Sequence, residues 1–389
     1  MRTALVLGIA TVLLVSGSLE RQVREWDVQL EARIGSVNDP EQSLTWVSQV
    51  LIGPNGRLFV AQPQDQRIRV FDQNGKLERT IGRRGQGPGE FGAVSAIGFR
   101  HDTLYVADNS TRRLSYFLAD GTFLESRQVA TPMIGRAPPE IYFPTVPQLL
   151  LSDGTALVKP EVPVALMASG TGKVPYLHVD REGQVIDTVS WEALPLATFE
   201  IRSGGTSFYA AKPFPETPLF HLLADGSGLI VVERASNHAR APDQFRVVKI
   251  GVSGDTVFSR AYPFEPVRLS SSASSSALDR IEARLARRPN PPSRREIEQT
   301  LRRLNLIPEY AVPVDAVASA SDGSIWLKRE SDGSGTNLWQ ILTPEGTLEG
   351  TVRLPGSQSV LAVTGRMLVT LELDSLDVPY VLRHGIRRQ

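Results

Sequence analysis

A short pattern that returns six times along the chain constrains its fold more than any other feature. Each copy is a turn residue followed by mostly apolar residues that favour β-strands, and another apolar stretch precedes it. The copies lie at 56–60, 102–106, 154–158, 227–231, 323–327 and 365–369. Because a tight turn separates the two apolar stretches, each copy predicts a β-hairpin.

A second hairpin follows each of the first five copies. Its turns lie at 72–75, 119–121, 180–183, 253–255 and 344–346, and alternating strands follow at 77–81, 123–129, 185–191, 256–262 and 348–354. Two hairpins give four antiparallel strands in a unit of about 40–50 residues, the spacing of a propeller blade. One such sheet cannot bury both of its faces, whereas stacking around an axis covers each face with a neighbour. We therefore predict an all-β fold, a β-propeller of four-stranded antiparallel blades.

The two ends of the chain predict how the ring closes. The sixth unit has strands at 367–371 and 378–382, and the chain ends before a fourth strand. Near the N-terminus, the sequence LEARIG at 30–35 parallels LERTIG at 77–82, which contains a fourth strand. We expect residues 26–35 to complete the last blade, because an open ring would leave strand edges unpaired. Residues 26–389 then form one six-bladed domain.

The largest interruption of the repeat lies at 265–312 and predicts a small helical insertion. Ser276-x-x-Asp279 and Ser293-x-x-Glu296 each precede apolar residues at helical spacing, which indicates two capped amphipathic helices. The insertion also holds eight arginines, at 280, 284, 287, 288, 294, 295, 302 and 303. A basic amphipathic helix can lie on an anionic membrane or bind a partner. We favour a simpler interpretation, in which the apolar stripe packs on the propeller and the charged face is solvated.

The first 18 residues have the features of a secretory signal peptide. Arg2 precedes an apolar run at 4–15, which is too short to span a bilayer, and small residues follow. We expect an exported protein, periplasmic or extracellular, that is not an integral membrane protein once this signal is cleaved. The 42 basic and 42 acidic residues balance, which argues against nucleic-acid binding. The absence of cysteine excludes disulfides, thiolate metal sites and lipid attachment to cysteine.

Two features of blades one and two, and one of the last blade, carry a resemblance to known propellers. Val106-Ala107-Asp108 with Arg113-Leu114, and Val60-Ala61-Gln62 with Arg67-Ile68, resemble the strand ends of NHL-type repeats. Residues 81–91 (IGRRGQGPGEF) are similar to the linker between NHL blades, and 376–381 (LDVPYV) is similar to a strand common in the last blade of bacterial relatives. The chain resembles bacterial exported six-bladed β-propeller proteins of largely uncharacterised function.

Searches for catalytic and metal-binding patterns give no strong candidate. The glycine-rich stretches 82–89 and 170–173 lack a phosphate-binding pattern, and no nucleophile elbow is present. None of the five histidines has metal-ligand spacing, although His221, expected on an inner strand of blade four, is the best axial candidate. We therefore predict no catalytic residue, no metal ligand and no cofactor.

The positions after each second strand are equivalent from blade to blade and point to one end of the ring. They are Gln62, Asp108, Glu233 and Arg329, our candidate ligand-binding residues. Asp108 is five residues from Arg113, and we expect the two to form a structural salt bridge across their loop. The function that these features favour is a monomeric binding module for an unknown protein or small molecule. The alternatives are a hydrolase or lyase with an axial divalent metal, and an interaction scaffold that uses the helices at 272–304.

Overall fold

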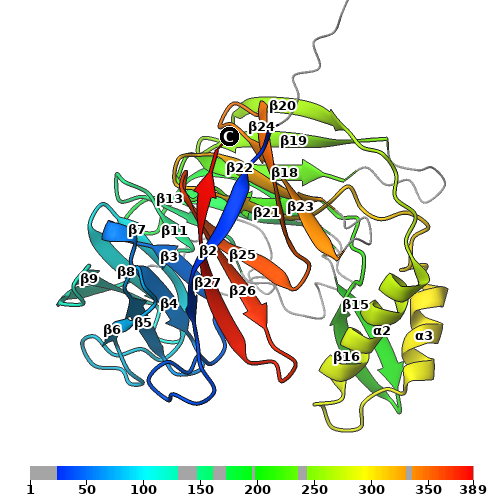
Figure 1. The fold of residues 1–389 in the computed structure, drawn as a ribbon, viewed down its shortest axis with the longest axis horizontal. Coiled ribbons are helices and arrows are strands. Elements are labelled where there is room, and N and C mark those ends of the chain that lie inside the picture. The colour runs from blue at the N-terminus through cyan, green and yellow to red at the C-terminus, as the bar shows by residue number, and fades with distance from the viewer. Residues whose placement is uncertain are drawn as a thin grey trace, which may run out of the picture.

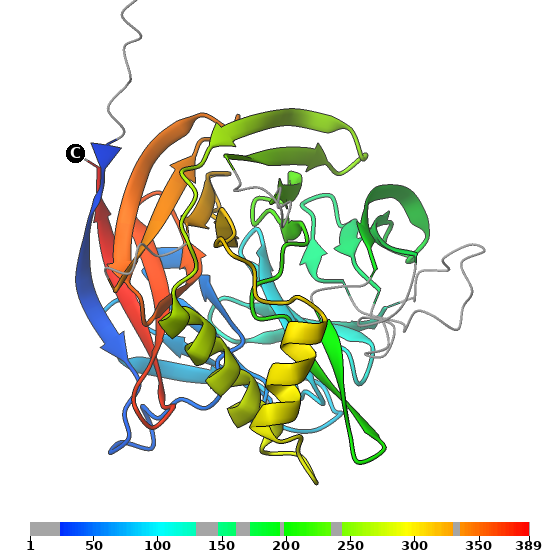
Figure 2. The same cartoon turned by 90° about the vertical axis from the view of Figure 1, so that its right-hand side faces the viewer.

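The fold is a ring of six four-stranded antiparallel sheets (Figures 1 and 2). The computed structural model describes residues 24–129, 147–160, 172–194, 198–234, 243–329 and 335–388, so the predicted signal peptide at 1–18 lies outside the described residues. This arrangement confirms the six-bladed β-propeller expected from the repeat.

Each blade is a meander whose strands pair in chain order. The strands of blades one to three are β3 (Gln49–Ile52), β4 (Leu58–Gln62), β5 (Arg67–Phe71) and β6 (Leu77–Ile81); β7 (Val94–Arg100), β8 (Thr103–Asp108), β9 (Arg113–Leu118) and β10 (Phe123–Gln128); and β11 (Leu149–Leu150), β12 (Ala156–Val158), β13 (Lys173–Val179) and β14 (Val185–Ala193). A 3₁₀ turn, η1 (Pro54–Gly56), joins β3 to β4.

The other three blades follow the same order. Their strands are β17 (Leu219–Leu222), β18 (Gly228–Glu233), β19 (Gln244–Gly251) and β20 (Thr256–Pro263); β21 (Val314–Ser319), β22 (Ile325–Arg329), β23 (Thr336–Leu342) and β24 (Leu348–Pro355); and β25 (Gln358–Val363), β26 (Met367–Leu373) and β27 (Pro379–Arg387), with β2 (Asp27–Ile34) as the fourth strand of blade six. The third strand of this blade is longer than the predicted 378–382.

The N-terminal strand closes the ring as predicted. β2 pairs antiparallel with β27, with Ile34 opposite Val381, and both side chains are fully buried. β1 (Arg24–Glu25) pairs in parallel with β24 of blade five, and the Trp26 ring packs against Trp326 with centroids 6.2 Å apart. Residues 24–34 therefore join blade six to blade five.

Each interface between neighbouring blades contains its own apolar cluster. Phe59, Ile97 and Phe117 lie in the cluster between blades one and two, and Trp326, Trp339 and Leu368 lie in the cluster between blades five and six. The other four interfaces contain equivalent clusters. Apolar burial is thus distributed around the ring, as stacked blades require.

Strand direction decides which loops share an end of the ring. In an antiparallel meander, the loop between strands two and three emerges at the same end as the linker to the next blade. We call this end the linker face. The linker at 194–218 contains the hairpin β15 (Thr198–Ser203) and β16 (Thr206–Ala211), and the linker at 264–313 contains α2 (Ser271–Leu285) and α3 (Arg294–Arg303).

These two linkers pack against each other to form a small subdomain, which we call the cap (Figures 1 and 2). Phe199 and Phe208 of the hairpin share a core with Leu278, Ile297 and Leu301 of the helices. The apolar stripe of the helices therefore packs on the hairpin. Our expectation that it packs on the propeller blades is wrong in that respect.

The helix starts were predicted with mixed success. The Ser293–Glu296 capping box is confirmed, because the Glu296 carboxylate accepts the Ser293 N–H at 2.8 Å and Ser293 Oγ accepts the Glu296 N–H. The predicted start at Ser276 is wrong. Ser270 caps α2 by accepting the Ala273 N–H at 3.1 Å, and the serine run continues as helix. Neither helix, nor any other in the described part of the chain, is long and apolar enough to cross a membrane.

Candidate functional site

The structure places the four candidate residues at equivalent positions but does not bring them together. Gln62, Asp108, Glu233 and Arg329 are each the last residue of the second strand of their blade, at the linker face. Gln62 and Asp108 are fully buried, Arg329 is half-buried, and Glu233 is exposed. Each has its own set of partners, and no hydrogen bond or ion pair in the described residues joins one of the four to another.

Asp108 holds a loop and a linker in place. Its carboxylate accepts five hydrogen bonds, from the backbone N–H groups of Gly92, Ala93, Ser110 and Thr111 and from the Ser110 hydroxyl, over 2.7–3.1 Å. Burial alone would raise the pKa of Asp108, but these donors outweigh it and the pKa is lowered. The carboxylate is thus held ionised within the protein.

The expected salt bridge between Asp108 and Arg113 is wrong, although the two residues face each other across β8 and β9. Arg113 instead donates to the carbonyl groups of Gln86, Gly87 and Glu90 in the linker between blades one and two. The long side chain of Arg113 reaches past Asp108, because the carboxylate oxygens of Asp108 already accept hydrogen bonds from nearer donors. Both residues are structural, but each fixes the linker separately.

The other candidates have ordinary partners. Gln62 donates to the Thr45 hydroxyl at 2.9 Å, and Glu233 lies 3.6 Å from Arg246. Arg329 donates to Gln340 Oε1 at 2.6 Å and stacks on Phe245 and Phe264, and burial lowers its pKa to about 10.

His221 lies on the first strand of blade four, as expected for an axial residue. Its Nε2 is 3.0 Å from the Ser319 hydroxyl, which also accepts the Ala224 N–H. Burial lowers the pKa of His221 to about 4, so the ring is neutral at pH 7. Within the described ranges, no three His, Asp or Glu side chains are grouped to hold a metal ion.

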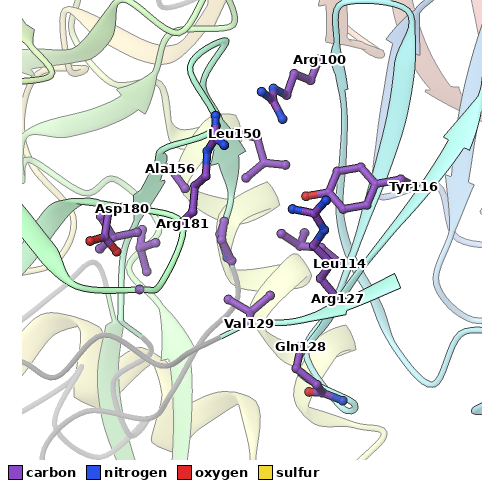
Figure 3. Close-up of a pocket in the computed structure, with 15 residues that line it drawn as sticks. Arg100, Leu114, Tyr116, Arg127, Gln128, Val129, Leu150, Ala156, Asp180 and Arg181 are labelled. Atoms are coloured by element: carbon purple, nitrogen blue, oxygen red, sulfur yellow. The ribbon is translucent and has the colours of Figure 1, made fainter. Parts of the chain in front are cut away.

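A pocket between blades two and three combines an apolar floor with charged walls (Figure 3). The floor is formed by the buried side chains Leu114, Leu150, Ala156, Val158 and Val179, which belong to the cluster between these blades. The blades are also joined by a hydrogen bond from the Leu150 N–H to the Tyr105 hydroxyl at 3.2 Å, and burial raises the pKa of this tyrosine to about 12. The floor of the pocket is thus part of the packed core between the two blades.

Three arginines and a tyrosine form one charged wall, and the carboxylate of Asp180 also lines the pocket on the side of blade three (Figure 3). Arg100, Arg127 and Tyr116 come from blade two and Arg181 comes from blade three, and their polar ends gather on one side of the pocket (Figure 3). Burial raises the pKa of Tyr116, and the positive charges of Arg127, Arg100 and Arg181 act in the opposite direction. All three guanidinium groups therefore lie close enough to influence this phenol.

A single turn of blade three anchors two of these arginines. Arg100 donates to the Ser152 carbonyl at 3.3 Å, and Arg181 donates to the Asp153 carbonyl at 2.6 Å. Neither has a carboxylate within 4 Å in the described residues, whereas Arg127 pairs with Glu125 at 2.7 Å. Two cations from different blades are thus fixed side by side by consecutive carbonyl groups.

The sequence did not indicate this pocket. Arg100 ends the first strand of blade two, Arg127 lies in its fourth strand, and Arg181 lies in a turn of blade three. None belongs to a motif, and only the stacking of the blades brings them together. To predict this pocket, the sequence would have to show how the sheets of blades two and three stack on each other, and the hairpin pattern does not show this.

A family model supports the fold. Residues 41–134 match the model of a family described as a 6-bladed beta-propeller. The chain is also similar to a Bacteroides fragilis protein described as exported, with 13% identity over 94% of this chain and 95% of that chain and a TM-score of 0.46. A member of the duf4221 family from Bacteroides vulgatus has 12% identity over 95% and 100% of the two chains, with a TM-score of 0.46.

Another similar structure is the PQQ-bound aldose sugar dehydrogenase of Streptomyces coelicolor, with 14% identity over 93% of this chain and 99% of that chain and a TM-score of 0.40. No curated protein matches the chain. The protein is a six-bladed β-propeller. Because this architecture hosts unrelated functions, its activity has to be argued from its own side chains.

Proposed function

We propose that this protein is an exported binding propeller, whose pocket between blades two and three takes a small anion with an apolar portion. One observation carries the proposal: Arg100 and Arg181 are fixed side by side without a carboxylate partner in the described residues, above an apolar floor. Export is supported by the signal-like residues 1–18. N-terminal sequencing of the mature protein tests that part.

The electrostatics of the wall favour an anion. Two like charges held close together repel each other, and an anion between them relieves that repulsion while accepting charge-assisted hydrogen bonds. Arginine suits this role because its planar donors match the two oxygens of a carboxylate or phosphate. The carbonyl groups of Ser152 and Asp153 hold the guanidinium groups in place before any ligand arrives.

The size and floor of the pocket limit the ligand. The enclosed space is about 80 Å³, against ~10–15 Å³ for one water on a comparable measure. It holds a small acid or one end of a longer ligand. The buried aliphatic side chains beneath favour a hydrocarbon portion beside the charged group.

Calorimetry with straight-chain carboxylates from acetate to hexanoate tests the proposal, with 1-hexanol as the neutral control. We expect affinity to rise with chain length and hexanol to bind far more weakly than hexanoate. Arg100→Gln or Arg181→Gln should reduce hexanoate affinity about 10-fold or more, because each removes a hydrogen bond to a charged group. Arg202→Gln, an exposed arginine in the cap, is the matched control. Absence of carboxylate binding, or equal binding by all variants, would refute the proposal.

The alternative function, a metal-dependent hydrolase or lyase with an axial site, has weaker support. His221 Nε2 lies 3.0 Å from the Ser319 hydroxyl, and among the described residues no group of three His, Asp or Glu side chains that could hold a metal ion is present. Metal analysis of the purified protein, with alanine variants of His221 and Glu233, separates the two functions. Stoichiometric Zn²⁺ or Ca²⁺ that is lost in these variants would favour the enzyme.

A further inference from the structure

The cap presents an unusual balance of charges to solvent. Its two helices and the turn between them contain eight exposed arginines and four acidic residues. Arg294 binds three of these acids, Asp279 at 2.7 Å, Glu282 at 2.6 Å and Glu298 at 3.6 Å. The fourth acid, Glu296, is used in the capping box of α3. All four carboxylates are therefore occupied within the cap.

Seven arginines remain with no ion-pair partner in the described part of the chain. They are Arg280, Arg284, Arg287, Arg288, Arg295, Arg302 and Arg303. The four acids of the cap are thus used internally, three by Arg294 and one by the capping box. The apolar faces of the helices are also used, because they pack on β15 and β16. The exposed surface of the cap therefore carries a surplus of positive charge.

Large apolar side chains are exposed at the same end of the ring. Val37 is 58% exposed and Trp46 63% in the linker between blades six and one, and Leu373 is 49% and Leu376 79% exposed at the loop between β26 and β27. A groove of about 650 Å³ lies between these two segments. All belong to the linker face by strand direction, and in Figures 1 and 2 both segments lie at the same lower end as the cap.

We propose that the linker face docks on an anionic lipid membrane, with the cap arginines at the phosphate groups and the Trp46 segment at the interface. A flat surface can touch the cap and the apolar loops together, because both project from the same end. Exposed apolar side chains clustered on one face mark an interaction surface, and tryptophan prefers the level of the lipid headgroups. Asp39 and Glu41 lie in the same linker as Trp46, so the electrostatic attraction comes from the cap.

This is a different mode from an inserted amphipathic helix. The Leu and Ile residues of α2 and α3 are buried against the hairpin and stay there. The helices contribute charge only, and the apolar contact comes from loops of blades six and one. Binding should therefore be peripheral, reversible and sensitive to salt.

Sedimentation with vesicles of phosphatidylglycerol and phosphatidylcholine, or of phosphatidylcholine alone, tests the docking surface. All proteins compared carry the same N-terminus, so any contribution of that segment cancels. We expect binding to anionic vesicles only, weakening steeply as salt increases. The triple variant Arg284→Gln, Arg287→Gln, Arg288→Gln should bind about 100-fold more weakly, since each basic residue near such a surface contributes a factor of about 5.

Two control variants make the test specific. Arg260→Gln, Arg366→Gln, Arg387→Gln removes the same charge away from the cap and should bind like the wild type. Trp46→Ala should weaken binding several-fold, whereas Val257→Ala, which shortens an exposed apolar side chain at the start of the fourth strand β20, at the opposite end of the ring, should not.

Three results would overturn the proposal. One is a lack of binding to anionic vesicles at low salt, and another is an equal loss in the two arginine triples. The third is equally tight binding to soluble polyglutamate with no effect of Trp46→Ala. That last outcome would assign the cap to an acidic protein partner.

Discussion

Replacing Ile34 with alanine tests whether the N-terminal strand closes the ring. Ile34 is fully buried at the end of β2, where it packs with Leu44, Val50, Phe71 and Val381. These neighbours come from blade six, blade one and the linker between them, so they cannot move together to fill the space. Ile→Ala changes at rigid buried sites cost about 2–5 kcal/mol. We expect about 3 kcal/mol for this one.

The corresponding shift in melting temperature follows from the size of the protein. Unfolding entropy is about 2.1 cal/mol/K per residue, which gives roughly 0.8 kcal/mol/K for a chain of 389 residues. A loss of ~3 kcal/mol then lowers the Tm by about 4 °C. Thermal unfolding followed by circular dichroism, with urea unfolding at 25 °C, measures both quantities.

Leu30 on the same strand is the matched control, because its side chain is 53% exposed. Leu30→Ala should change the free energy of unfolding by less than ~1 kcal/mol. Ile34 and Val381 are direct register partners, so the double alanine variant should deviate from additivity by about 0.5–3 kcal/mol. If Ile34→Ala melts within about 1 °C of the wild type, β2 does not close the ring and our account of blade six fails.

Three further predictions concern linkers and buried polar groups. Gly82→Ala should lower the free energy of unfolding, measured by urea titration, by about 2–4 kcal/mol, since φ is +77° and the new Cβ would lie 2.0 Å from the Phe91 ring. Gly205→Ala is the control: its φ is +79° but no atom lies near the new Cβ, so it should cost only ~1 kcal/mol. Asp108→Asn should destabilise the protein by about 2–3 kcal/mol, because the NH₂ of the new amide would face a backbone N–H group that donates a hydrogen bond to the carboxylate in the wild type. An unchanged urea midpoint would disprove the role given to Asp108. Burial lowers the pKa of His221 to about 4, below its unfolded value, so its contribution to stability is complete above about pH 6.5 and is lost as the pH falls toward 4. Between pH 7.5 and 4.5, His221→Gln should lose less stability than the wild type by on the order of 2 kcal/mol, and parallel curves would contradict this.

The strands were predictable because their signals are local. Each Gly-containing turn fixes where two strands begin, and the LEARIG segment repeats the pattern of a fourth strand close enough to identify its place. The β15–β16 hairpin also has a local signal, Gly204-Gly205 between alternating residues. Its packing on α2 and α3 has none, because the partners are about 70 residues apart and meet only through the ring.

The candidate site was harder to predict for a related reason. Asp108 and Arg113 do face each other, as their spacing suggests. Which atoms then pair depends on competing donors and acceptors in the linker at 86–93, which the spacing does not reveal. Arg100 and Arg181 become neighbours only when blade three stacks on blade two. The contents of one blade are readable from the sequence, but contacts between blades depend on their stacking.

Strand direction also separates the two proposed surfaces. Arg100 ends the first strand of its blade and Arg181 lies in the turn between strands three and four, so both belong to the end opposite the linker face. The cap and the Trp46 segment are built from inter-blade linkers, which emerge only at the linker face. A protein docked on a membrane through its linker face would therefore turn these two arginines away from the lipid. Hexanoate binding and vesicle binding should then be independent, and competition between them would mean that at least one surface is misplaced.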